Sequence, residues 1–91
     1  MSVSVRIPTI LRTYTNGESE VAADGGTLAE VLDSLESSYP GIKGRILDEQ
    51  GALRRFVNVY VGNDDVRFLE SLDTSTPEGA QVSVIPAVAG G

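Results

Sequence analysis

Three segments of the chain alternate hydrophobic and polar residues with a period of two. Near the N-terminus, Val3, Val5 and Ile7 alternate with serine and arginine, and residues 56–61 repeat the pattern with valine at every second position. Because successive side chains of a strand point to opposite faces of a sheet, each segment predicts a half-buried β-strand. Residues 80–85 carry the same alternation near the C-terminus and predict the last strand.

Two turn signals predict shorter partner strands. Residues 16–17 are Asn-Gly, which favours a hairpin because both residue types tolerate positive φ. We therefore expect residues 10–11 to continue the first strand after an interruption by proline, and residues 18–22 to form its return strand. A Gly-Asn-Asp turn at residues 62–64 likewise predicts a short return strand at residues 66–68.

A helical pattern begins at Thr27. Thr27 and Glu30 are spaced as a capping box, in which each side chain accepts a hydrogen bond from a free backbone N–H of the first turn. The apolar residues that follow recur with helical spacing and form one face: Leu28, Val31, Leu32 and Leu35. Pro-Gly at residues 40–41 ends the pattern, so the sequence predicts one amphipathic helix of about three turns.

The order of these elements predicts an α+β fold. A hairpin, a helix and further strands pack as a ubiquitin-like β-grasp: a mixed sheet of four to five strands with one main helix on one face. Residues 1–85 form this domain, and residues 86–91, which are small and show no periodicity, form a flexible C-terminal tail. The predicted core consists of Val3, Val5, Ile7, Leu28, Val31, Leu32, Leu35, Val57, Val59, Val61, Val82 and Val84.

Composition narrows the possible functions. A chain of 91 residues is one domain, and it contains neither cysteine nor histidine. It therefore lacks the thiolate nucleophile and the most common general base and metal ligands. The net charge of −6 disfavours binding to nucleic acids and to anionic membranes. Without a signal-peptide pattern or a long apolar run, we expect a cytoplasmic protein that binds no metal itself.

Adjacent carboxylates occur at Asp64 and Asp65, and they could be interpreted as a metal site or an acid–base pair. Both lie in a predicted turn, where aspartate is favoured because its side chain bonds to nearby backbone N–H groups. Two neighbouring carboxylates without a third ligand rarely hold a metal ion. We interpret them as turn residues.

Residues 77–91 contain a glycine turn, an alternating strand, a proline and a terminal Gly-Gly. This C-terminal run resembles the closing pattern of the MoaD/ThiS family of ubiquitin-like sulfur carriers. The resemblance extends along essentially the whole chain. Within the family, residues 55–61 and 64–68 look most like the carriers of an actinobacterial cysteine pathway. The resemblance also implies that the first and last strands lie parallel at the centre of the sheet.

The family resemblance implies that the carboxyl group of Gly91 is the working group. In such carriers an E1-like enzyme of the MoeB, ThiF or MoeZ type adenylates this carboxylate with ATP and Mg²⁺. A sulfur donor then displaces AMP and leaves a thiocarboxylate. The carrier binds no cofactor itself and is a substrate of other enzymes, not an enzyme.

The tail is expected to thread a narrow channel of the activating enzyme. Glycine lacks a Cβ and lets backbone approach closely, alanine keeps the tail thin, and proline fixes φ where the tail leaves the sheet. The residues assigned to this role are Pro86, Ala87, Val88, Ala89 and Gly90.

The sheet face away from the helix is the expected partner-binding face. Phe56, Tyr60 and Ile85 lie on the out-of-core phase of their strands, where apolar side chains indicate an interface. Basic side chains are expected at its rim: Arg6, Arg54 and Arg55.

The sequence leaves open which molecule finally accepts the sulfur. The resemblance implies an acceptor such as a cysteine synthase that uses O-phosphoserine, with a JAMM-type zinc peptidase releasing the product. Alternatives are molybdopterin synthesis, a secondary metabolite such as a thiosugar, a role as a protein modifier, and a β-grasp interaction module without covalent chemistry. Lys43 is the only lysine, which disfavours branched polymers of the modifier kind.

Overall fold

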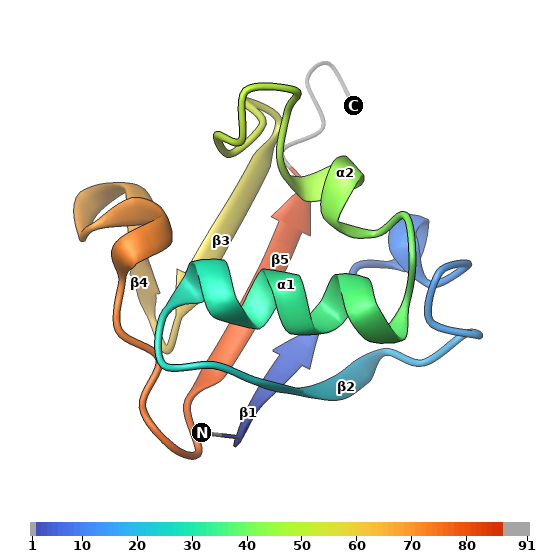
Figure 1. Cartoon of the computed structure of the whole chain (residues 1–91), viewed down its shortest axis with the longest axis horizontal. Helices are drawn as coiled ribbons and strands as arrows, with labels where there is room; N and C mark the ends of the chain where they lie inside the picture. Colours follow the sequence, from blue (N-terminus) through green and yellow to red (C-terminus); the bar gives the residue numbers. More distant parts are fainter. Residues whose placement is uncertain (1, 87–91) are drawn as a thin grey trace.

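The computed structural model describes residues 2–86, which form one sheet with helices on one of its faces (Figure 1). The strands are β1 (Ser2–Arg6), β2 (Glu20–Asp24), β3 (Val57–Val61), β4 (Asp64–Asp65) and β5 (Gln81–Pro86). The helices are α1 (Leu28–Ser38), α2 (Lys43–Ile46) and three 3-10 turns, η1 (Thr9–Leu11), η2 (Val66–Phe68) and η3 (Ser71–Asp73).

The sheet has five strands in the order β2-β1-β5-β3-β4. β1 and β5 pair in parallel, and the three other strand pairs are antiparallel. In Figure 1, α1 crosses in front of this sheet and α2 lies near its upper end. The predicted ubiquitin-like β-grasp, with its mixed sheet, its one main helix and its parallel central strands, is therefore confirmed.

α1 begins with the predicted cap. The hydroxyl of Thr27 accepts from the backbone N–H of Glu30 at 3.4 Å. The Glu30 carboxylate reaches one residue further back than in a standard capping box and accepts from Gly26 N at 2.7 Å. The helix ends at Ser38, just before the predicted Pro-Gly stop.

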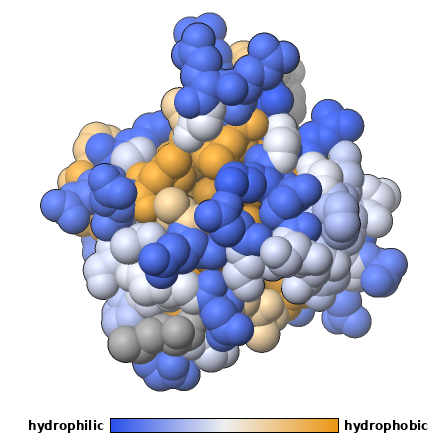
Figure 2. Space-filling view, in the orientation of Figure 1, coloured by the Kyte–Doolittle hydropathy of each residue, from blue (hydrophilic) through white to orange (hydrophobic). Residues whose placement is uncertain are grey.

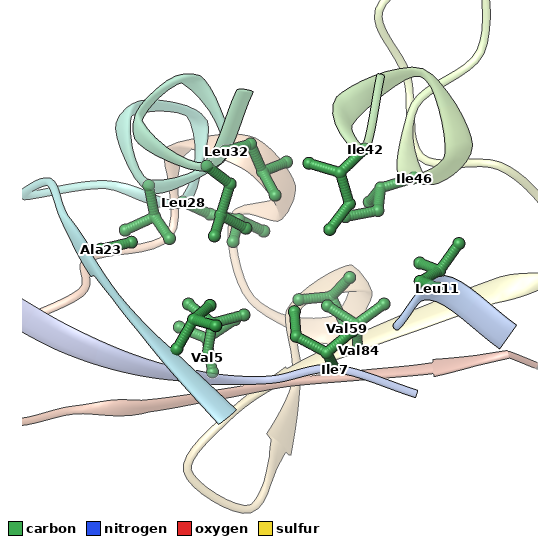
Figure 3. Packing of buried hydrophobic residues seen from close by; sticks show 14 of the residues in the cluster. Val5, Ile7, Leu11, Ala23, Leu28, Leu32, Ile42, Ile46, Val59 and Val84 are labelled. Carbon is green, nitrogen blue, oxygen red and sulfur yellow. The ribbon is translucent and has the colours of Figure 1, made fainter. Parts of the chain in front are cut away.

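The core lies between α1, α2 and one face of the sheet. Figure 3 shows Leu28 and Leu32 of α1 and Ile42 and Ile46 beside them facing Val5, Ile7, Val59 and Val84 of the sheet layer. Every predicted core residue is buried except Val61, which is partly buried. The sequence analysis missed seven buried residues: Leu11, Val21, Ala23, Ile42, Ile46, Leu47 and Val66.

Two strand predictions were wrong. Residues 9–11 form η1, because Pro8 has no N–H for the β-ladder and its carbonyl accepts from Leu11 N at 2.9 Å instead. Residues 66–68 form η2, because the Asp65 carboxylate accepts from Arg67 N at 2.9 Å and starts a helical turn.

The connection between β1 and β2 is longer than a tight hairpin. Asn16 and Gly17 adopt the predicted positive φ values of 57° and 87°. They lie in a loop that folds around the buried hydroxyl of Thr15, which donates to Glu18 O at 2.8 Å. The return strand therefore starts at Glu20, two residues later than the start predicted from the turn.

The face that carries α1 is mostly hydrophilic. Figure 2 shows polar and charged side chains over most of it, with an apolar area above α1 in this view. Within residues 2–86, no helix is long and apolar enough to cross a bilayer.

A substitution at Gly25, between β2 and α1, tests how closely the chain approaches the first turns of α1. A Cβ at this position would lie 2.6 Å from Val31 N, inside the first turns of α1, whereas a Cβ at Gly26 would lie 3.5 Å from the flexible Glu30 carboxylate. We expect Gly25→Ala to lower the free energy of unfolding by about 1–3 kcal/mol, and Gly26→Ala to cost clearly less. Urea denaturation of both variants measures the difference, and equal values would contradict this packing.

Glu36 predicts a pH dependence of stability. Backbone N–H groups of Gly41 and Lys43, each at 2.9 Å, donate to its carboxylate and lower its pKa below the ordinary value of 4.5. The resulting stabilisation is complete above that ordinary value and is lost as the pH falls through the lower folded pKa. Wild type should therefore exceed Glu36→Gln in unfolding free energy at pH 7, and the gap should shrink by pH 3. A gap that does not change with pH would contradict this role.

Candidate functional site

β5 carries the chain to the candidate site and ends there. Pro86 pairs with Val57 at the start of β3, so the strand extends one residue beyond the predicted end at Ile85. The proline predicted to direct the tail outward is thus the last residue of the sheet. The residues expected to carry and thread the reactive carboxyl group lie outside the described residues: Ala87, Val88, Ala89, Gly90 and Gly91.

Two residues of the predicted partner face lie on the open side of the sheet. Val82 and Val84 of β5 are buried, so Ser83 and Ile85 between and beyond them point to the opposite face. Tyr60 pairs with Ser83, which makes Tyr60 and Ile85 diagonal neighbours across β3 and β5. Ile85 is 47% exposed and Tyr60 is half-buried, so the two together form an apolar surface near the end of β5.

Phe56 and the two arginines before it lie at the same end of the sheet. Phe56 directly precedes β3, is 56% exposed and has the Arg55 guanidinium 5.9 Å from its ring centroid. Arg54 donates from Nε to Gly44 O at 3.1 Å and so lies against α2. The structure therefore places the aromatic ring and its arginines at the edge of the surface formed by Tyr60 and Ile85.

Arg67 holds this segment in place, and no pattern in the sequence indicates this role. Its guanidinium donates to Asn58 Oδ1 and to the carbonyl of Arg54, each at 2.7 Å. These bonds join the segment before β3 to the open face of the sheet. Arg67 thus positions Arg54 although it belongs to η2.

A groove lies on the other side of the β5 end. Its volume is about 410 Å³, and it is lined by residues 6–10, Arg12 and residues 83–86. Ile10 and Arg12, which the sequence analysis did not place at the site, belong to this wall. The only signal in the sequence is the apolar Ile10 two residues after Pro8, and the alternation there predicts a strand residue.

The described part of the site is suited to recognition. Apolar side chains occupy the surface around the β5 end, and arginines surround them. Such an arrangement of an apolar centre and a polar rim is typical of protein interfaces.

Comparisons with known proteins agree with this architecture. Residues 5–91 match the model of the ThiS family. The sulfur carrier protein CysO of Mycobacterium tuberculosis is 50% identical over 93 residues, covering 100% of both chains. A chain in the crystal structure of the BexX/CysO complex of Amycolatopsis orientalis is 49% identical, with a TM-score of 0.92, and the match covers 98% of this chain and 99% of that one.

A more distant relative has a different name. The small archaeal modifier protein 3 of Haloferax volcanii is 41% identical over 68 residues, which cover 75% of this chain and 73% of the relative. The ThiS and CysO matches confirm the predicted resemblance to sulfur carriers. They also confirm the predicted similarity, within the family, to carriers of the CysO kind.

Proposed function

Because the chain belongs to the ThiS family and is a sulfur carrier rather than an enzyme, we propose that it carries sulfur on the carboxyl group of Gly91. Full-length identity of 50% to the CysO of Mycobacterium tuberculosis supports this proposal most directly. The match to the family model extends to residue 91, so the terminal Gly-Gly falls within the region of similarity.

Loading requires activation because a carboxylate is a poor electrophile. Its charge is delocalised, and its leaving group would be oxide. An E1-like partner of the MoeB, ThiF or MoeZ type joins the Gly91 carboxylate to the α-phosphate of ATP and releases pyrophosphate, with Mg²⁺ held by that partner. A sulfide equivalent then attacks the acyl carbon and expels AMP, which leaves the thiocarboxylate.

The fold suits this task because it holds the start of the tail rigidly. β5 is paired with β1 as far as Ser83 and with β3 as far as Pro86, its last residue. The apolar surface around Tyr60 and Ile85 lies beside that residue. A partner that binds this surface thereby gains a fixed origin for the five residues that follow, and this reduces the entropic cost of positioning Gly91.

The acceptor we favour is a cysteine synthase that uses O-phosphoserine. The thiocarboxylate sulfur would replace phosphate on the acceptor carbon, the new amino acid would shift to an amide with Gly91, and a JAMM-type zinc peptidase would release cysteine. The similarity to CysO supports this route. A secondary-metabolite or molybdopterin acceptor, or single attachment as a protein modifier, would use the same activated carboxyl group.

Removal of the terminal residue tests the carrier chemistry. We expect deletion of Gly91, or a tag added after it, to abolish thiocarboxylate formation. The deletion shortens the tail that carries the carboxyl group, and the tag blocks that group. The wild-type protein incubated with activating enzyme, ATP and a sulfide source should gain the mass difference between sulfur and oxygen. A tag at the N-terminus is the control. Thiocarboxylate formation on the deleted chain would contradict the proposal.

The partner face predicts a change in affinity and not in chemistry. We expect Ile85→Ser to raise the KM for carrier activation by roughly tenfold, as truncation of a buried interface anchor does, with kcat unchanged. Ala22→Ser is the control, since Ala22 is exposed on β2, which β1 separates from β5. Equal KM values for the two variants would show that the face around Ile85 does not bind the activating enzyme.

A further inference from the structure

The groove beside the β5 end, here called the exit groove, has the features of a peptide-binding site. It is lined by residues 6–10, Arg12 and residues 83–86, with a volume of about 410 Å³. Ile10 is 65% exposed and Ile85 is 47% exposed, so apolar side chains at its walls remain in contact with solvent. Exposed apolar side chains that line a hollow beside a functional terminus indicate an interface more than a chance distribution.

The backbone of β5 also offers a free acceptor to this groove. In the parallel ladder, Ser4 N donates to Ala80 O at 3.0 Å, and the register continues with Arg6 opposite Ser83. The next donor in this series would be the N–H of residue 8, directed at the carbonyl of Val84. Residue 8 is proline, so β1 supplies no donor at this position, and Val84 is one of the groove-lining residues.

The electrostatics of the exit groove differ from those of the whole chain. The chain carries a net charge of −6, yet the lining of the groove contains Arg6 and Arg12 and no acidic residue. Glu20 is opposite Arg6 in the β1–β2 register, but its carboxylate accepts from Ser4 Oγ at 3.2 Å and Gln81 Nε2 at 2.8 Å. Among residues 2–86, neither groove arginine forms an ion pair with a carboxylate.

We propose that the exit groove binds an extended segment of the activating enzyme that carries a carboxylate next to an apolar side chain. The inference rests on the proposed function. The carboxylate would lie between Arg6 and Arg12, the apolar side chain between Ile10 and Ile85, and a backbone N–H of the segment would donate to Val84 O. A small free anion would satisfy only the two arginines and would leave both isoleucines in water.

The short distance that the tail can span explains why the activating enzyme is the partner. Five residues separate Pro86 from the chain end, and five residues span at most about 17 Å. The enzyme must bring ATP to Gly91 within that distance, so its surface has to lie over the end of the sheet where the groove opens. Carboxylates on that surface would meet the two arginines during docking, which favours encounter with a carrier that is otherwise acidic.

Single substitutions separate the exit groove from the rest of the surface. Arg6→Gln is the informative charge variant, because Arg12 also donates from Nε to Ile7 O at 3.1 Å and supports η1. Ile10→Ser tests the apolar wall. Arg45→Gln on α2 makes the same change in net charge outside the groove and is the matched control. Thermal unfolding of each variant checks that the fold is retained.

The readout is ATP–pyrophosphate exchange by the activating enzyme at varied carrier concentration. We expect Arg6→Gln and Ile10→Ser each to raise the KM for the carrier roughly tenfold, with kcat at saturation unchanged, and Arg45→Gln to change KM less than about twofold. If both groove variants behave like the control, the inference is overturned. If the wild-type carrier supports no exchange at all, it is the proposed function that fails.

A second measurement tests whether the chain's own tail occupies the groove. Amide spectra of the ¹⁵N-labelled carrier are compared with those of a variant lacking residues 87–91, without enzyme. Unchanged signals for residues 9–12 support an exit groove that is open to the partner. Large shifts of those signals on truncation would show that the tail occupies the groove and would overturn the inference.

Discussion

Parallel pairing between β1 and β5 is the interaction on which the rest of the structure depends. It joins Ser4 to Gln81, so the two ends of the chain meet at the centre of the sheet. β2 then extends the sheet from β1, and β3 and β4 extend it from β5. The pairing closes a loop that includes almost the whole chain, and burial of the α1 face against these strands offsets the entropy of that closure.

Prolines end this central pairing and separate the rigid domain from the working end. Pro8 and Pro86 both lack the N–H that the ladder would need to continue. β1 therefore turns away into η1, and a groove opens beside the last four residues of β5. The sheet thus ends within five residues of Gly91 and leaves there a surface that has apolar walls, two arginines and a free backbone acceptor.

The acidic composition and the basic working end serve different purposes. The carboxylates of Glu30 and Glu36 accept hydrogen bonds from backbone N–H groups at the two ends of α1. These acidic side chains therefore stabilise the ends of the helix. Glu20 is engaged by its neighbours on the sheet and leaves Arg6 available. A net charge therefore describes this chain poorly, because the groove beside the β5 end is lined by two arginines and by no acidic residue.

The sequence by itself determined the helix, the three main strands, the face of α1 that is buried and the family to which the chain belongs. These features rest on local patterns, such as the cap at Thr27 and the alternation of residues 56–61, which depend on neighbours in the chain. Only the tertiary structure decided the conformation of Ile10 and Val66, which lie in short 3-10 turns instead of the predicted strands. It also decided that Ile10 stays exposed while Val66 is buried, because burial depends on distant elements. The exit groove belongs to the same class: residues 6–10 and 83–86 line it together because β1 and β5 pair in parallel, and no local pattern records that pairing.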